Sequence, residues 1–208
     1  MKIIDPSYKI TKMDAPQEIY EHLEASGKVC YAATPKAPSA EAFVRRLVQR
    51  KHMSVIEHAG MSVEFVTDRG VSHQLVRHRL NSVAQQSTRY CNFNKNKFGS
   101  EITVVRPPFW KENTPEYEEW LTAMLFAEKK YMDLIALKAK PEEARSVLPN
   151  SLATTIVVTS NFRQWAEIFR QRCASDAHPQ IRQLMQPLLL EMREKLPAIF
   201  EDVCKVAP

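Results

Sequence analysis

Glycine is the residue whose scarcity most restricts this chain. It occurs only at positions 27, 60, 70 and 99 of the 208 residues. Neither the glycine-rich turn of a dinucleotide-binding βαβ unit nor a phosphate-binding P-loop can be written with this spacing, because both need closely spaced glycines. If the protein binds nucleotides, side chains must therefore hold the phosphates. The planar guanidinium of arginine suits that task, and the chain has fourteen arginines.

Composition and charge indicate a globular protein with an anionic partner. Hydrophobic residues make up 44% and charged residues 25% of the chain, which is typical of folded domains. The net charge of +5 favours nucleic acid, phosphorylated metabolites or folate-like polyanions as partners. Four scattered cysteines without a CxxC pair predict reduced thiols and a cytoplasmic location. We expect no membrane association, because the sequence contains neither a membrane-spanning apolar run nor a signal peptide.

The pattern of elements predicts an α+β fold. No repeat, low-complexity tract or linker divides the sequence, so we expect a single domain over residues 1–208. Strands and helices are mixed without regular βαβ alternation, which favours α+β. Strands are expected at 1–10, 61–65, 102–108 and 151–159, with a turn at 68–70. Helices are expected at 16–27, after Ser39, at 71–79, 115–137, from Pro141, at 162–172, and from Pro179 with a kink or division at Pro187.

The segment RHRLNSVAQQSTRY, residues 77–90, concentrates hydrogen-bond donors. It contains three guanidiniums, one imidazole and several amides and hydroxyls, but almost no apolar side chains. A structural segment of this length would normally show an apolar stripe. On a helix, Arg77, His78 and Arg79 could not share one face, since successive residues step by about 100°. The segment is therefore either a solvated basic loop or a site for an anion.

The segment HMSVIEH, residues 52–58, and two nucleophilic side chains allow less specific interpretations. His52 and His58 are six residues apart, which favours different faces and argues against a metal site. Ser87 and Cys91 are candidate nucleophiles, but neither lies in a GxSxG elbow or a cysteine-protease context. We expect Ser87 to donate to a phosphate and Cys91 to be an inert thiol.

The remaining arginines have ordinary structural alternatives. Arg145, in RSVLPN, could simply pair with a neighbouring glutamate. Arg163 and Arg170 are seven residues apart, a spacing typical of a solvated helix face. Arg172 lies at the end of the same helix, where a cation also suits the helix dipole.

Together these segments resemble the flavin-dependent thymidylate synthases. Residues 77–90 are similar to the family signature RHR-x-x-S-x-N-E-x-S-x-R-Y. HMSVIEH resembles the segment H-x-[ST]-x-x-E-H, RSVLP resembles R-x-x-L-P, and AHPQIR resembles the tail A-Q-x-E-I-R. Asn161-Phe162-Arg163, followed by Arg172, resembles the N-x-R helix and its final arginine. The order is kept from residue 52 to residue 182, but Ala84 and Gln85 replace the usual Asn and Glu, and Glu167 stands where relatives can have Asn.

The resemblance implies an activity, a fold and an assembly. The activity is reductive methylation of dUMP to dTMP, with 5,10-methylenetetrahydrofolate as carbon donor, FAD as hydride carrier and NADPH as reductant. No enzyme nucleophile and no metal are implied. The fold would be α+β, with a mixed or antiparallel sheet flanked by helices, in a homotetramer whose subunits share active sites.

The resemblance also assigns residues. Arg172 would be catalytic, because a guanidinium beside the uracil ring favours ionisation at N3 and raises electron density at C5. Residues implied to bind dUMP are Gln74, Arg77, Gln85, Gln86, Ser87, Thr88, Arg89, Arg145 and Arg172. Residues implied to bind FAD are His52, Ser54, Arg77, His78, Arg79, Gln85, Asn161 and Arg163.

Two alternatives stay open at this stage. A basic nucleic-acid-binding module would need exposed aromatics among its cations, whereas Phe43, Trp165 and Phe169 have core spacing. A family member that binds nucleotide with impaired turnover is suggested only by Ala84 and Gln85.

Overall fold

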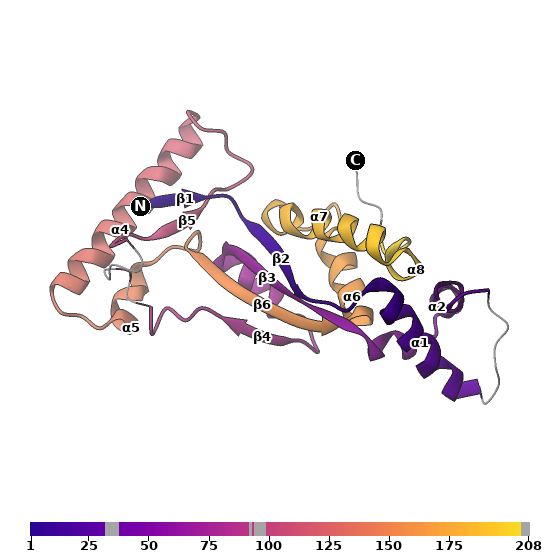
Figure 1. Ribbon diagram of the computed structural model, residues 1–208. Helices are drawn as coiled ribbons and strands as arrows, with labels where there is room; N and C mark the ends of the chain where they lie inside the picture. Colours follow the sequence, from indigo (N-terminus) through magenta and orange to yellow (C-terminus); the bar gives the residue numbers. More distant parts are fainter. Residues whose placement is uncertain (32–37, 92, 94–98, 205–208) are drawn as a thin grey trace. The chain divides into compact units, whose positions relative to one another are not determined.

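The computed structural model describes residues 1–31, 38–91, 93 and 99–204, and the chain in it divides into two compact units (Figure 1). Unit 1 contains Met1–Ser7, Phe65–Arg77 and Ala84–Ile156. Unit 2 contains Tyr8–Glu64, His78–Val83 and Val157–Pro208. A single functional domain over residues 1–208 stays a prediction.

A four-stranded antiparallel sheet, flanked by helices, confirms the predicted fold class. Its strand order is β2 (Ser7–Lys12), β3 (Gly60–Asp68), β6 (Ala153–Asn161) and β4 (Ser82–Gln85). Burial alternates along β3 and β6, as expected for strands with one face on a core. The strands predicted at 61–65 and 151–159 are thus confirmed. β3 extends further at both ends, whereas β6 starts and ends two residues later than the sequence indicated.

The helical part of unit 2 consists of α1 (Pro16–Tyr31), α2 (Ala40–Gln49), α6 (Phe162–Arg172), α7 (Pro179–Lys195) and α8 (Pro197–Phe200). A short 3-10 helix, η1 (Val55–His58), precedes β3. Trp165 and Phe169 of α6 are completely buried, which confirms the predicted core face of this helix. The Trp165 indole donates to the Met61 carbonyl oxygen at 3.1 Å and so fixes α6 to β3. Asn161 caps α6 by accepting from the Gln164 amide at 2.8 Å.

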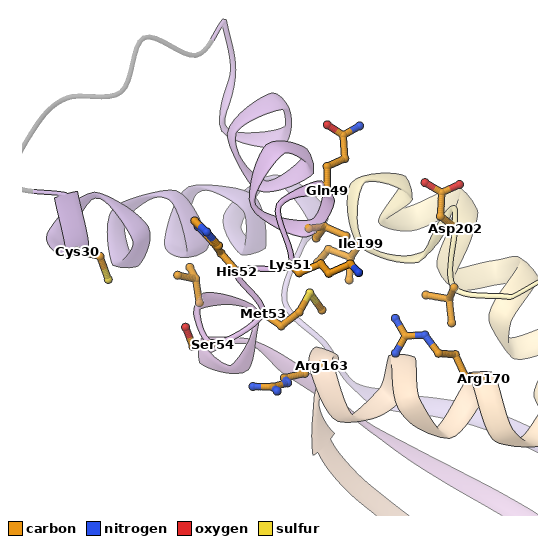
Figure 2. A pocket seen from close by; sticks show the side chains of 13 residues that line it. Cys30, Gln49, Lys51, His52, Met53, Ser54, Arg163, Arg170, Ile199 and Asp202 are labelled. Atoms are coloured by element: carbon orange, nitrogen blue, oxygen red, sulfur yellow. The ribbon is translucent and has the colours of Figure 1, made fainter.

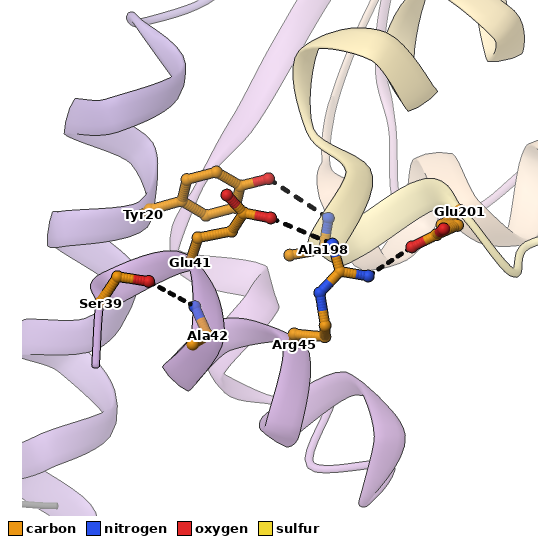
Figure 3. Close-up of polar contacts among 7 residues, drawn as sticks. All are labelled: Tyr20, Ser39, Glu41, Ala42, Arg45, Ala198 and Glu201. Atoms are coloured by element: carbon orange, nitrogen blue, oxygen red, sulfur yellow. Dashed lines mark hydrogen bonds and ion pairs between the residues drawn. The ribbon is translucent and has the colours of Figure 1, made fainter. Parts of the chain in front are cut away.

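Figure 3 shows polar contacts of α1, α2 and the region of α8. The Ala198 amide donates to the Tyr20 hydroxyl at 3.3 Å, and burial raises the pKa of Tyr20 to about 12. Arg45 of α2 forms ion pairs with Glu41, at 3.0 Å, and with Glu201 just after α8. These pairs are partly exposed, so we expect them to orient the helices more than to stabilise them.

The prediction that α1 ends at Gly27 is wrong. The helix continues to Tyr31, and Gly27 is buried within it. A Cβ atom at this position would lie 2.7 Å from the Phe43 ring of α2. Glycine is needed here for close helix packing, and it costs helix stability of only about 1 kcal/mol relative to alanine.

Unit 1 is built on a parallel pair of strands and one long helix. β1 (Lys2–Ile4) pairs with β5 (Thr103–Val105), and α4 (Pro115–Ala136) packs on the same core. Thr114 caps α4 by accepting from the Tyr117 amide, which confirms the helix predicted from residue 115. Two short helices follow, α5 (Pro141–Ala144) and the 3-10 helix η3 (Arg145–Val147). The core residues include Ile102, Val104, Trp120, Tyr131 and Leu152.

Several predicted boundaries need correction. Residues 1–10 form two strands rather than one, separated at Asp5-Pro6. The turn expected at 68–70 is the start of α3 (Arg69–Leu75), because Asp68 caps this helix by accepting from the Val71 amide at 2.7 Å. α3 then ends before the signature segment begins. α7 continues through Pro187 and is not divided there. No described helix is long and apolar enough to span a bilayer.

Candidate active site

The signature segment, residues 77–90, begins after helix α3 has ended. α3 ends at Leu75, and residues 82–85 form the edge strand β4. Arg77 and Arg79 are exposed, whereas His78 between them is only 8% exposed. The helix predicted over residues 71–79 therefore ends at Leu75, and in the non-helical backbone that follows His78 is buried between two exposed arginines.

Gln85 is held by hydroxyl groups of unit 1. Its side-chain nitrogen donates to Ser72 Oγ at 2.9 Å and to Thr154 Oγ1 at 3.3 Å. The resemblance implied contacts of Gln85 with dUMP and FAD. In the protein the side-chain nitrogen links β4 to α3 and β6. Gln74, one helical position beyond His73, is half-buried on α3.

Four of the residues implied to bind dUMP, Ser87, Thr88, Arg89 and Arg145, lie in unit 1 and form two hydrogen-bonded pairs. Arg145 donates from Nη1 to the buried Thr88 hydroxyl at 3.2 Å. Arg89 donates from Nε to Glu142 at 3.3 Å and lies over the Tyr90 ring, 5.5 Å from its centroid. Ser87 Oγ accepts from the Arg89 amide at 3.2 Å, which orders the turn that carries these residues. Sequence reasoning paired Arg145 with a neighbouring glutamate as its alternative, but it is Arg89 that makes that pair.

Arg69 adds a cation that sequence reasoning missed. Its backbone amide donates to the Asn150 carbonyl oxygen at 2.9 Å, so α3 is joined to the loop after η3. Its Nη1 is buried and has no hydrogen-bond partner among the described residues. Burial, and secondly the positive charge of Arg145, lower the pKa of Arg69. A cluster of arginines with an unsatisfied guanidinium is an environment that favours an anion.

Gln86 differs from its neighbours in the signature. Its side chain lines a smaller cavity of about 410 Å³ in unit 1, together with Phe93, Thr154 and Thr155. The side-chain nitrogen of Gln86 donates to Cys91 Sγ at 3.5 Å, and its backbone amide donates to the Thr155 carbonyl oxygen. Gln86 is therefore hydrogen-bonded to β6 through its backbone.

A cavity with a volume of about 820 Å³ lies in unit 2 (Figure 2). Three residues implied to bind FAD line it: His52, Ser54 and Arg163. Arg163 also donates to Glu57 at 2.6 Å. The other walls come from the ends of α1 and α2 and from the residues around α8. Further polar and charged residues of the lining are Cys30, Gln49, Lys51, Arg170 and Asp202.

Lys51 and Arg170 are cavity residues that sequence reasoning did not identify. The seven-residue spacing of Arg163 and Arg170 indicated a solvated helix face, and both side chains project from α6 on the cavity side (Figure 2). A cation directly before His52 was the available signal for Lys51. Asn161, also implied to bind FAD, does not line this cavity, and its side-chain oxygen caps α6.

Arg172, the predicted catalytic residue, is hydrogen-bonded to His78, and both residues belong to unit 2. Its Nε donates to His78 Nε2 at 2.8 Å. Burial, and then the charge of Arg172, lower the pKa of His78 to about 4, with a smaller opposing effect of Glu167. Burial also lowers the pKa of Arg172. The pair therefore consists of a charged guanidinium and a neutral imidazole at neutral pH.

Comparison with known proteins identifies the family of this chain. The family described as "Thymidylate synthase complementing protein" matches residues 10–198. The flavin-dependent thymidylate synthase of Mycobacterium avium (strain 104) is 32% identical over 202 residues, covering 86% of this chain and 78% of the relative. The enzyme of the same name from Corynebacterium diphtheriae is 31% identical over 222 residues, covering 95% of this chain and 84% of the relative.

A solved structure shows the same fold. The UMP/dUMP methylase PolB from Streptomyces cacaoi, bound with 5-Br dUMP, superposes with a TM-score of 0.77 at 19% identity. The alignment covers 97% of this chain and 96% of PolB. The family match over most of the chain and the two relatives above 30% identity lead to one conclusion: this chain belongs to the flavin-dependent thymidylate synthase family.

Proposed function

We propose that this protein converts dUMP to dTMP by transferring the methylene group of 5,10-methylenetetrahydrofolate to C5 of uracil and reducing it to a methyl group. The observation that carries the proposal is the cavity of unit 2. His52, Ser54 and Arg163, which the family resemblance implies to bind FAD, all line it. They come from two segments that are more than a hundred residues apart in the sequence.

The residues around the cavity fit an FAD molecule. FAD carries a pyrophosphate with two negative charges, and Arg163, Arg170 and Lys51 supply positive charge in the cavity. The Ser54 hydroxyl and the His52 imidazole add further hydrogen-bonding groups. The volume of about 820 Å³ lies in the range typical of cofactor sites. Side chains thus replace the glycine-rich backbone that holds pyrophosphates in other folds.

The arginine cluster of unit 1 fits the phosphate of dUMP. Thr88 and Ser87 offer hydroxyls, and Arg145 and Arg89 offer charged donors next to them. Arg89 is paired with Glu142 through an exposed contact, which is weak enough to be exchanged for a phosphate dianion. The hydrogen bond from Arg145 to the Thr88 hydroxyl holds these two side chains next to each other.

Arg172 would act on the uracil ring. Its guanidinium stabilises negative charge at N3, which increases the electron density at C5 for attack on the methylene carbon. The methylene carbon needs two electrons to become a methyl group, and C5 loses its hydrogen as a proton. The bond between the methylene carbon and the folate nitrogen breaks, and folate leaves as tetrahydrofolate. A bound flavin would then supply the two electrons as a hydride, with NADPH as their source, and no side-chain nucleophile takes part.

The proposal includes a homotetramer in the cytoplasm. Arg77, Arg79, Leu80 and Tyr90 are exposed in the single chain although they belong to the signature segment, and Leu80 is 87% exposed. A neighbouring subunit would cover them and complete the site. The four cysteines are free thiols, which agrees with a reducing compartment.

Visible absorbance of the purified protein tests the proposal. We would record the spectrum alone, after adding FAD and desalting, and again with dUMP, and then measure dTMP formed from dUMP, methylenetetrahydrofolate and NADPH. Retained flavin bands that shift with dUMP, together with dTMP formation, support the proposal. Flavin and dUMP binding without dTMP would indicate the impaired family member. A folded oligomer that retains no flavin and binds DNA with a steep salt dependence would indicate the nucleic-acid-binding alternative.

A further inference from the structure

The hydrogen bond between Arg172 and His78 determines how the guanidinium is presented. Arg172 is the last residue of α6, and His78 lies in the irregular segment before β4. Arg172 Nε is 2.8 Å from His78 Nε2. A guanidinium can only donate, so Nε2 must be the acceptor, and the ring proton must lie on Nδ1. His78 is therefore the neutral Nδ1–H tautomer.

The neutral acceptor leaves the charge of the arginine intact. A carboxylate bonded to Nε would neutralise much of the field that the guanidinium exerts on a ligand. The nearest acidic residue on the same helix is Glu167, and it accepts from Gln171 at 2.7 Å and from Arg170 at 3.3 Å. The acceptor at Nε is instead a buried imidazole. At Nε, the guanidinium is thus held by a group that does not neutralise its charge.

We propose that His78 is a positioning residue that holds Arg172 by its Nε edge and directs its Nη end toward the uracil ring of dUMP. This inference rests on the proposed function. A guanidinium whose Nε–H is donated to His78 can offer uracil only its Nη groups. Two parallel N–H donors match two adjacent acceptors, which on an ionised uracil are N3 and a neighbouring carbonyl oxygen. A flavin contact of His78 would then use Nδ1–H as the donor.

Two substitutions at His78 separate the effect of the hydrogen bond from the effect of side-chain size. His78→Gln keeps a neutral acceptor, whereas His78→Leu removes it. His22→Gln and His22→Leu are matched controls, because His22 is an exposed histidine of the same unit whose recorded ring contact is with His58. The readout is the N3 ionisation of bound 5-bromo-dUMP, followed by its ultraviolet difference spectrum against pH, in the FAD-loaded protein. Steady-state kinetics with dUMP accompany it.

The Leu variant should raise the apparent N3 pKa of bound 5-bromo-dUMP by about one to two pH units, because a hydrogen bond to a charged group is lost. It should lower kcat about 10- to 100-fold, with a smaller change in KM for dUMP. The Gln variant should keep most of the wild-type ionisation, and the His22 variants all of it. Equal N3 ionisation in the wild type and His78→Leu, with flavin retained in both, would overturn the positioning role alone.

A measurement on the wild type keeps the inference testable if His78→Leu does not fold. Nitrogen-15 NMR of the imidazoles, assigned with His78→Gln, distinguishes the two neutral tautomers. The Nδ1–H form at neutral pH supports the inference, and the Nε2–H form or an imidazolium overturns it. Wild-type protein that does not bind 5-bromo-dUMP would instead refute the proposed function, and the positioning role with it. The two failures are therefore distinguishable.

Discussion

Acidification should destabilise the protein through His78. The folded-state pKa of about 4 lies below the ordinary value of 6.5, because the ring is buried beside Arg172, with Glu167 opposing weakly. Between these two values the unfolded chain binds the proton and the folded protein does not. This contribution to stability is fully present above pH 6.5 and is lost as the pH falls toward 4. At about 1.36 kcal/mol per pKa unit the complete loss is about 3 kcal/mol, of which about 2 kcal/mol falls between pH 7 and pH 5.

Comparison of the wild type with His78→Gln isolates this effect. Other groups titrate in both proteins, so their contributions cancel in the difference between the two unfolding free energies. We expect urea unfolding to show that His78→Gln gains about 2 kcal/mol relative to the wild type between pH 7 and pH 5. His22→Gln, which removes an exposed imidazole, should show no such trend. A pH-independent difference between the wild type and His78→Gln would refute the burial and charge argument.

Three further predictions concern packing and charge. Gly60→Ala would place a Cβ against the Ser160 carbonyl oxygen and 2.9 Å from Asn161 Cα, so thermal unfolding should show a free energy of unfolding lower by about 1–3 kcal/mol. An unchanged free energy of unfolding would contradict the close approach of β3 and β6. Glu142→Gln removes the carboxylate bonded to Arg89, so calorimetry should show dUMP binding tightened by about 1.5- to 5-fold, and weaker binding would argue against a phosphate role for Arg89. Arg69→Met removes a partly buried guanidinium with an unsatisfied Nη1, so the melting temperature of the ligand-free protein should stay the same or rise, while dUMP binding weakens. A lowered melting temperature without ligand would show that Arg69 has a structural role.

Elements with strong local signals were predictable from the sequence. The caps at Asp68, Thr114 and Asn161 are short polar side chains that accept from the first turn of a helix, and two of the three were identified as helix starts. β4 was not predictable, because three of its four residues are exposed and no apolar alternation marks the strand. Gly27 misled for a different reason: the absence of a side chain ends some helices and allows close packing in others.

The sequence named residue types for the candidate site but not their geometry. The family motif identified His52, Ser54 and Arg163, and they do line one cavity. Arg170 could not be assigned, and Lys51 only through its place directly before His52, because other walls of the cavity come from segments around Cys30 and Ile199 that are distant in the sequence. A motif identifies the side chains of a site but not the protein groups that hydrogen-bond to them.

Gln85 shows how a departure from the family signature can be accommodated locally. The Ser72 hydroxyl donates its only proton to the Arg69 carbonyl oxygen at 3.0 Å, so toward Gln85 it can only accept. The Gln85 amide nitrogen provides the required donor, and Thr154 accepts from the same nitrogen. A glutamate at this position would compete for the Ser72 proton that α3 already uses. The replacement of Glu by Gln is therefore matched to the hydroxyls of this chain, and by itself it is no reason to expect impaired turnover.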